Sequence, residues 1–259
     1  MSRCVEVSRF ALGLFALTLL PATATAAAAP SPAPSAAAAP VVHKPLRHLA
    51  FSVDIDQSTQ TDMRTIDVAA SKGGNTEHYV AGSVAHGTIV CDIVGVTPDG
   101  NLLVDVTEDS SENRSSATKR VAVQKDGGLV FLPNQGTLNE EESELVTLLA
   151  PGLMGGDRAT GDSWTYRQTA PNYSASKTFR LSEIKNANDV SLSVEETYTR
   201  SGADGLSGTI LGTLDYDPAS LVPLNAKLNK TTRQEDTTGY KTRKLGMTYT
   251  LKEDSLAKH

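Results

Sequence analysis

The residues best suited to chemistry include an acidic pair, Asp215 and Asp217, just before a Pro-Ala-Ser turn. Two carboxylates this close could bind a cation. Asp followed by Pro is also typical of a β-turn, in which the Asp side chain accepts backbone N–H groups and Pro presets the next φ. We favour the turn, and we expect both carboxylates to lie on the solvent side of a hairpin.

Other candidate metal ligands are incomplete in number or spacing. The segment "DIDQSTQTD", residues 54–62, begins like a calcium loop but lacks the Gly at position six and the Glu at position twelve. The sequence has five histidines: His43, His48, His78, His86 and His259. His78 and His86 could lie near each other across a short connection, but two ligands are fewer than a structural zinc requires. We therefore predict no metal and no cofactor.

Candidate nucleophiles also lack partners. The S-x-x-K matches include Ser116, Ser174 and Ser255, and neither S-D-N nor K-T-G accompanies them. At least two of these matches fall at strand starts, where positions three apart point to opposite faces, so Ser and Lys would not meet. Cys91 lies in the apolar run "GTIVCDIVGV", which favours a buried structural thiol. G-x-S-x-G and H-E-x-x-H are absent, and we predict that the protein is not an enzyme.

A set of apolar and aromatic residues offers a different kind of site. A concave sheet face could hold a lipid-like molecule, since such pockets are mostly apolar with few polar anchors. The candidate lining residues are Trp164, Tyr198, Leu214, Tyr216, Leu224, Leu228, Met247 and Tyr249. The alternative is that these residues are the protein's core. We favour that alternative, because most apolar stripes are buried for stability.

Strands must position these side chains, because polar and apolar residues alternate along most of the chain. "HLAFSVDI" and "KLGMTYTLK" each place every second side chain on an apolar face. Turn residues separate such runs at 72–75, 98–101, 125–128, 186–189 and 217–220. The pattern predicts a mainly β fold: an antiparallel meander of ten to twelve strands forming a curled sheet or half-barrel. Pro223 predicts an edge strand or a bulge.

One segment, "TLNEEESELVTLLAPG", has helical spacing instead. Thr137 and Asn139 are candidate caps, three glutamates follow in the first turn, and Pro151 ends the run. We predict one amphipathic helix over residues 140–150. Its leucine stripe is expected to pack against the sheet.

The first forty residues predict export. Residues 1–26 combine a charged start, a short apolar run and an A-x-A exit, as in a secretory signal peptide. Residues 27–40 contain only Ala, Pro and Ser, which is typical of a disordered linker. We therefore expect cleavage near Ala26, a single β-rich domain over residues 41–259, and a periplasmic or extracellular location. We predict no transmembrane segment in the mature chain.

The charge balance argues against nucleic-acid binding. The chain has 24 basic and 30 acidic residues, which become 22 and 29 when Arg3, Arg9 and Glu6 leave with the signal peptide. A nucleic-acid binder usually shows a concentrated basic surface. Residues 225–249 hold six bases and two acids. They could form a basic rim for an anionic headgroup or glycan, but we favour ordinary solvated strand faces.

The order of these features resembles a group of uncharacterised secreted or periplasmic bacterial β-rich proteins. The resemblance spans residues 85–250 and includes the G-D-x-W strand start, Gly161 to Trp164, after the helix and its proline. The architecture also looks like the curled β half-barrels of periplasmic lipoprotein carriers and related lipid-binding proteins. That resemblance implies a long sheet around a helix and an apolar cavity, although this chain has fewer helices and few aromatic residues.

Two hypotheses for function remain beside the enzyme, which ranks last. The first is a binding module that holds a hydrophobic small molecule, with the helix as plug or lid. The second is a structural or interaction protein with a filled core, which contacts an envelope component.

Overall fold

The structure is a computed structural model of the 259-residue chain. It describes residues 45–64, 76–110, 117–150, 153, 158–202, 205–236 and 239–256. Several sequence predictions lie outside this part of the chain: the signal peptide, the linker, the 72–75 turn, His43 and His259.

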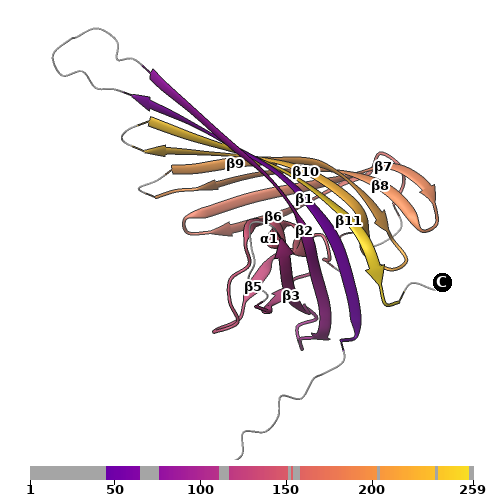
Figure 1. The fold of residues 1–259 in the computed structure, drawn as a ribbon. Helices are drawn as coiled ribbons and strands as arrows, with labels where there is room; N and C mark the ends of the chain where they lie inside the picture. The colour runs from indigo at the N-terminus through magenta and orange to yellow at the C-terminus, as the bar shows by residue number, and fades with distance from the viewer. Residues whose placement is uncertain are drawn as a thin grey trace, which may run out of the picture. The chain divides into compact units, whose positions relative to one another are not determined.

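The described residues form one antiparallel sheet of eleven strands with one helix (Figure 1). The first five strands are β1 (Arg47–Arg64), β2 (Thr76–Val96), β3 (Leu102–Ser110), β4 (Lys119–Val123) and β5 (Leu129–Phe131). The helix is α1 (Glu140–Thr147). The remaining strands are β6 (Ser163–Ala170), β7 (Tyr173–Asn186), β8 (Asp189–Arg200), β9 (Gly205–Asp217), β10 (Val222–Asp236) and β11 (Gly239–Asp254). The predicted fold class is therefore confirmed.

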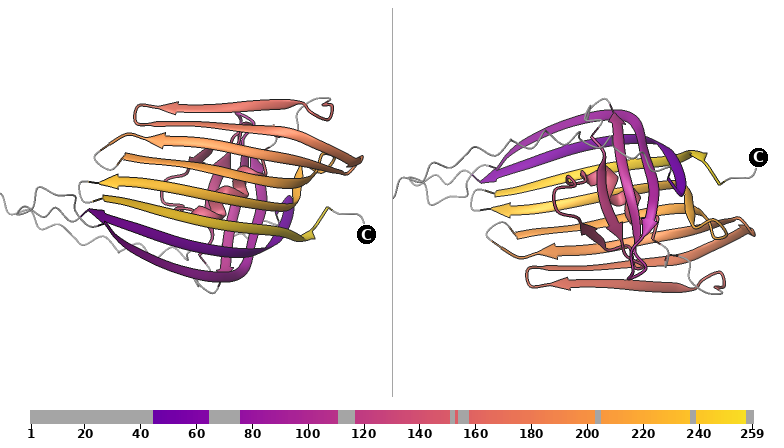
Figure 2. Two further views of the ribbon diagram at one scale, coloured as in Figure 1. Left: turned by 90° about the horizontal axis from the view of Figure 1, so that it is seen from above. Right: turned by 90° about the horizontal axis from the view of Figure 1, so that it is seen from below.

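The sheet consists of two meanders that start from opposite edges. Strands β1 to β5 run from the middle to one edge, α1 leads to the other edge, and β6 to β11 return to the middle. The strand order is β5-β4-β3-β2-β1-β11-β10-β9-β8-β7-β6. The sheet curls so that α1 lies against its concave side (Figure 2). The two meanders join where β1 pairs with β11.

The alternating sequence pattern explains which face is buried. On β1, Leu49, Phe51 and Val53 are fully buried on the concave side. Across the sheet, Tyr249 and Leu181 come from alternating positions of their own strands and belong to the same core. The polar residues between these positions face the convex side, which gives a sheet with one face on a core and one in water.

Helix α1 begins as the sequence predicts and ends earlier. The side chain of Asn139 accepts the N–H of Glu142, while the Glu142 carboxylate accepts the N–H of Asn139 at 2.8 Å, which is a capping box. The helix ends at Thr147 instead of residue 150, because the N–H groups of Leu148 and Leu149 bond to carbonyls three residues back. The expected leucine stripe is confirmed: Leu145, Leu148 and Leu149 are buried in the core.

The hairpin at residue 217 shows the predicted bulge. Pro223 pairs with Tyr216 and Asn225 pairs with Asp215, so Leu224 is the extra residue on β10. The bulge moves Leu224 out of the buried row, and its side chain is only partly buried. The proline is accommodated because a bulge needs one ladder hydrogen bond fewer.

A buried ion pair connects β1 and β11, the two strands at which the meanders join. Arg47 on β1 donates from Nε and Nη2 to the two carboxylate oxygens of Asp254 on β11, at 3.0 and 2.6 Å. Arg47 also donates from Nη1 to the carbonyl of Ser220 at 2.5 Å. Burial alone would raise the pKa of Asp254, but the bonds from Arg47 and from the Leu256 N–H outweigh it and hold that pKa below its ordinary value.

We expect Asp254→Asn to lower the free energy of unfolding by about 1.5 kcal/mol at pH 7, because Arg47 loses a bidentate bond to a carboxylate and keeps a single acceptor, a neutral amide oxygen. A depressed carboxyl pKa stabilises the fold above the unfolded value, ~3.9, and this contribution is lost as pH falls through the folded value. The difference between wild type and variant should therefore shrink on acidification below about pH 4. Urea unfolding at a series of pH values measures this difference in unfolding free energy. A difference that stays constant with pH would contradict the role assigned to the Arg47–Asp254 ion pair.

Candidate functional site

Helix α1 is held on the concave face by ion pairs as well as by leucines. Four basic side chains from four strands surround it: Lys119 on β4, Lys177 on β7, Lys230 on β10 and Arg243 on β11. Their acceptors are glutamates of α1 and one glutamate of β8. We call these four cations and their glutamate partners the ionic belt.

The individual pairs of the ionic belt are short. Lys119 donates to both oxygens of Glu142 at 2.8 and 2.6 Å, and the Glu142 side chain is fully buried. Lys230 lies 2.7 Å from a Glu144 oxygen and 3.0 Å from a Glu140 oxygen. Arg243 also binds Glu140. The acidic helix and the inner face of the sheet are thus complementary in charge.

Lys177 completes the ionic belt on β7. Its Nζ lies 2.7 Å from a carboxylate oxygen of Glu196 on β8 and 3.9 Å from one of Glu144. The pairing joins the helix to the second half of the sheet. All three residues are largely buried, so the pair is poorly screened by salt.

Two hollows open beside α1 on this side of the sheet, a third lies at the ends of two hairpins, and all three are lined in part by Tyr173. The first, about 390 Å³, lies between α1 and strands β7 to β11. The second, about 380 Å³, lies between α1, the β4–β5 hairpin and strands β6 to β8. The third, about 670 Å³, is a notch at the ends of the β6–β7 and β8–β9 hairpins. We call the first two together the concave groove and the third the notch, and each is within the size range of small-molecule sites.

The middle of the concave groove has an aromatic floor. Tyr198 on β8 faces Gly208 on β9, and a Cβ added to Gly208 would lie 2.3 Å from the Tyr198 ring. Only glycine therefore lets the ring lie on the neighbouring strand. The Tyr198 and Thr232 hydroxyls are 2.7 Å apart, and Lys230 Nζ lies 5.2 Å from the ring centroid.

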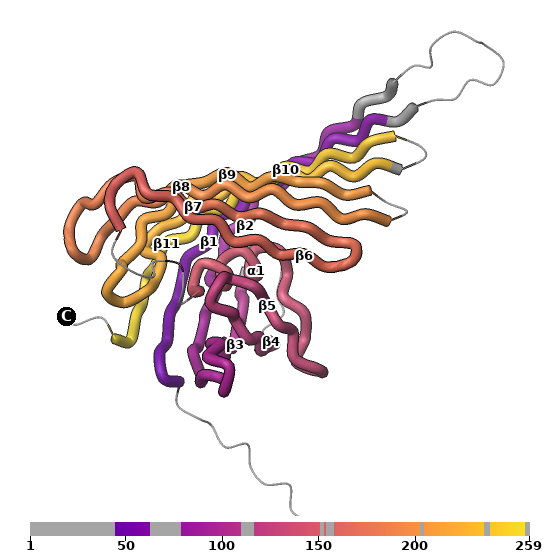
Figure 3. The backbone as a smooth tube through the Cα atoms, turned by 180° about the vertical axis from the view of Figure 1, so that it is seen from behind, coloured from indigo at the N-terminus to yellow at the C-terminus, as the bar shows by residue number. Residues whose placement is uncertain are grey.

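The second hollow lies between the two edges of the sheet. Leu129 and Phe131 line it from the β5 side, and Tyr166 lines it from β6. Figure 3 shows α1 between these strands. Phe131 is 49% exposed, so part of this apolar lining faces solvent. Burial raises the pKa of the Tyr166, Tyr173 and Tyr198 hydroxyls, so all three are neutral near pH 7.

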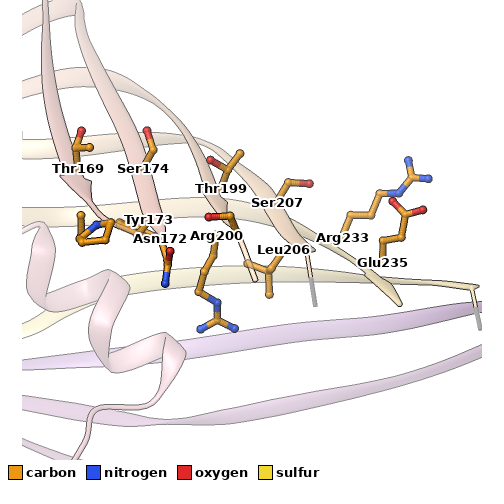
Figure 4. A pocket seen from close by; sticks show the side chains of 14 residues that line it. Thr169, Asn172, Tyr173, Ser174, Thr199, Arg200, Leu206, Ser207, Arg233 and Glu235 are labelled. Carbon is orange, nitrogen blue, oxygen red and sulfur yellow. The ribbon is translucent and has the colours of Figure 1, made fainter. Parts of the chain in front are cut away.

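The side chains at the notch divide between the two faces of the sheet (Figure 4). Arg200 and Leu206 extend toward the side of α1, whereas Thr199 and Ser207 point the other way. Arg200 pairs with Tyr173 on β7 and with Leu206 on β9. The groove therefore has an apolar, aromatic middle and a basic side chain at one end.

Comparison with known proteins identifies no family for this chain and one weak structural similarity. No family model matches the sequence, so the expected bacterial group finds no support there. No curated protein matches it either. A solved structure described as "lipid-protein interactions in lipovitellin" is similar, with a TM-score of 0.45 and 10% identity. The similarity covers 84% of this chain and 26% of the lipovitellin chain, so this chain spans about a quarter of that length. The function proposed for this chain rests on its own residues.

The candidate lining residues predicted from the sequence divide into three groups. Tyr198, Leu214, Tyr216, Leu228, Met247 and Tyr249 are buried together in the hydrophobic core. Trp164 packs against that core, stacked on Phe179 with the Arg158 guanidinium 3.8 Å from its ring centroid. Leu224 lies at the bulge. Of the eight, Tyr198 lines the concave groove.

The acidic pair at the 217–220 turn has the geometry expected of a turn. Asp217 accepts the N–H groups of Ala219 and Ser220 at 2.9 and 3.3 Å, and it also accepts the Ser220 hydroxyl. Asp215 accepts Lys185 Nζ and Ser191 Oγ, each at 2.7 Å. Each carboxylate thus has its own protein partners.

The other residues considered for chemistry lie apart from one another. Residues 54–62 belong to the continuous strand β1, so they do not form a calcium loop. His48 bonds to Asp92 at 2.7 Å, and His86 bonds to Asp54 at 2.6 Å. Cys91 is buried, and burial raises its thiol pKa. Among the described residues, no three His, Cys, Asp or Glu side chains are placed to hold a metal ion. Across the same residues, no helix is long and apolar enough to cross a bilayer.

Sequence reasoning missed Tyr173, Arg200 and Leu206 as groove residues. The signal that could have found them is the extension of the alternating pattern to the strand ends. Tyr173 continues the inward row of Phe179 and Leu181, and Arg200 continues the row of Tyr198. A basic residue at the end of a row of apolar side chains indicates that this end of the face contacts something other than the hydrophobic core.

The basic segment 225–249 also differs from expectation at two positions. Lys230 and Arg243 are not on a solvated face: they point to the concave side and pair with α1. By contrast, Lys227 and Lys244 are exposed on the convex side, as expected.

Proposed function

We propose that the protein is an exported, non-enzymatic binding protein whose concave groove holds an elongated, lipid-like ligand beside α1. The observation that carries the proposal is that two hollows lined by α1 residues share Tyr173, which also lines the notch next to them. The core beneath α1 is filled by side chains such as Tyr249 and Met247. The ligand therefore lies next to the helix and not under it.

The lining suits such a ligand. Aromatic and aliphatic surfaces of Tyr173, Tyr198, Ala175 and Leu206 provide apolar contact. The glutamates of α1 and β8 that face the groove are paired with lysines and an arginine, so they present little net negative charge to a ligand. Apolar walls with a few oriented polar groups are typical of small-molecule sites.

A pair of variants on one strand tests the proposal. Ala175 lines the concave groove, while its neighbour Ser176 faces the convex side. We expect Ala175→Trp to fill the second hollow and weaken binding of the neutral probe Nile red about tenfold, equivalent to ~1.4 kcal/mol. Ser176→Trp should leave the affinity unchanged. Fluorescence titration of both variants and wild type gives the dissociation constants.

Lipid extraction from the protein purified from its own host provides a second measurement. We expect co-purifying lipid, identified by mass spectrometry, to fall in the Ala175→Trp variant. Absence of both extractable lipid and Nile red binding in wild type would overturn the proposal. Equal loss of binding in the Ala175 and Ser176 variants would also overturn the groove as the binding site.

A further inference from the structure

We infer that the ligand of the concave groove is an anionic amphiphile whose carboxylate or phosphate group binds Arg200. This inference rests on the proposed function and adds the chemical class of the ligand and its orientation. The apolar part would lie along Tyr173 and Tyr198, and the charged group would lie at the notch.

Three basic side chains that line the groove from the concave side already have carboxylate partners. They are Lys177, Lys230 and Arg243, and each is paired with a glutamate of α1 or β8. These three cations hold the helix in place. A ligand that used any of them would have to displace a largely buried glutamate, which is costly.

Arg200 differs from these three cations. It is the last residue of β8, it is exposed, and it lines both the first hollow and the notch. Within the described residues, no hydrogen bond or ion pair involves its side chain. Its guanidinium therefore retains its full set of donors for a ligand.

The surroundings of Arg200 set the orientation. Its strand neighbours on the same face are Tyr173 and Leu206 (Figure 4), so its charge stands at the end of an apolar surface. A guanidinium offers a planar pair of N–H donors that matches the two oxygens of a carboxylate or phosphate. Partial removal from water beside these two side chains strengthens such a bond relative to a fully solvated one.

The test compares ligands that differ only in charge. Laurate, lauryl phosphate and methyl laurate are titrated against wild type, Arg200→Met, and the control Arg180→Met, which removes an exposed arginine from the convex face of β7. We expect wild type to bind both anions at least about tenfold more tightly than the ester. Arg200→Met should abolish this preference and leave the affinity for methyl laurate unchanged, while Arg180→Met behaves like wild type.

The outcomes separate the two proposals. Acetate and inorganic phosphate test whether the anion alone suffices, and we expect neither to displace laurate at millimolar concentration. Equal binding of ester and anions by wild type, or a preference that survives Arg200→Met, would overturn the inference and leave the proposed function standing. Displacement of laurate by phosphate alone would overturn the amphiphile as ligand. Failure of all three lauryl compounds and of Nile red to bind would overturn the proposed function itself.

Discussion

Replacing Lys230 with methionine is expected to lower the free energy of unfolding by about 4 kcal/mol, because breaking a buried ion pair leaves uncompensated charge behind. Lys230 Nζ contacts both Glu140 and Glu144, and its own side chain is only 14% exposed. Methionine preserves much of the aliphatic stem, so packing along Tyr198 changes little. Urea unfolding followed by circular dichroism measures the difference.

Two further variants test the explanation. Lys227→Met lies on the same strand but faces the convex side, where it is exposed, and should change stability by less than about 0.5 kcal/mol. Adding Glu144→Gln to Lys230→Met should recover part of the loss, because one unpaired charge is removed. An equal cost at both lysines, or no recovery in the double variant, would contradict the ionic belt as a source of stability.

The pH range of this contribution follows from the pKa of Lys230. Burial by itself would lower that pKa, but the carboxylates of Glu144 and Glu140 outweigh it and raise the pKa above its ordinary value. A raised amine pKa stabilises the fold below the unfolded value, ~10.4, and the contribution is lost as pH rises through the folded value. The cost of Lys230→Met should therefore be undiminished at neutral and mildly alkaline pH.

Truncating Leu145 to alanine is expected to cost about 3 kcal/mol of unfolding free energy, the typical effect of removing a buried leucine and leaving a cavity. Leu145 is fully buried in the core between α1 and the sheet. Thermal and urea unfolding should both report the loss. The matched control is Leu211→Ala on β9, where the leucine is 53% exposed on the convex face, and we expect at most about 0.5 kcal/mol there. Similar losses of unfolding free energy at the two leucines would mean that α1 does not cover the core.

The strands and the inward rows could be predicted because both follow from local alternation. Leu49, Phe51 and Val53 repeat every two residues, and a one-residue shift would expose all of them. The turns at 98–101, 125–128, 186–189 and 217–220 were likewise found between strands, because Gly, Pro, Asp and Asn favour turn dihedrals irrespective of the rest of the fold.

The ionic belt could not be predicted, since its partners are far apart in the chain. The glutamates of α1 were interpreted as favourable to the helix dipole, which is a local effect. Lys230 and Glu144 are 86 residues apart, and Arg243 and Glu140 are 103 residues apart. Only the placement of α1 across four strands brings them together. The groove escaped prediction for the same reason, because its lining combines α1 with strands from both halves of the sheet.

The joint between β1 and β11 has a consequence for how the chain reaches this fold. Arg47 and Asp254 are 207 residues apart, yet the ends of their strands are bonded neighbours, with His48 and Ser255 exchanging hydrogen bonds at 2.9 and 3.0 Å. If these ends were linked and the chain opened between α1 and β6, every adjacent strand pair would become consecutive in sequence. Such a circular permutant would have a lower contact order, and chains with lower contact order fold faster. In the natural order of strands, the β1–β11 pairing is the non-local contact that joins the two meanders, and the eleven-stranded sheet is complete only when it forms.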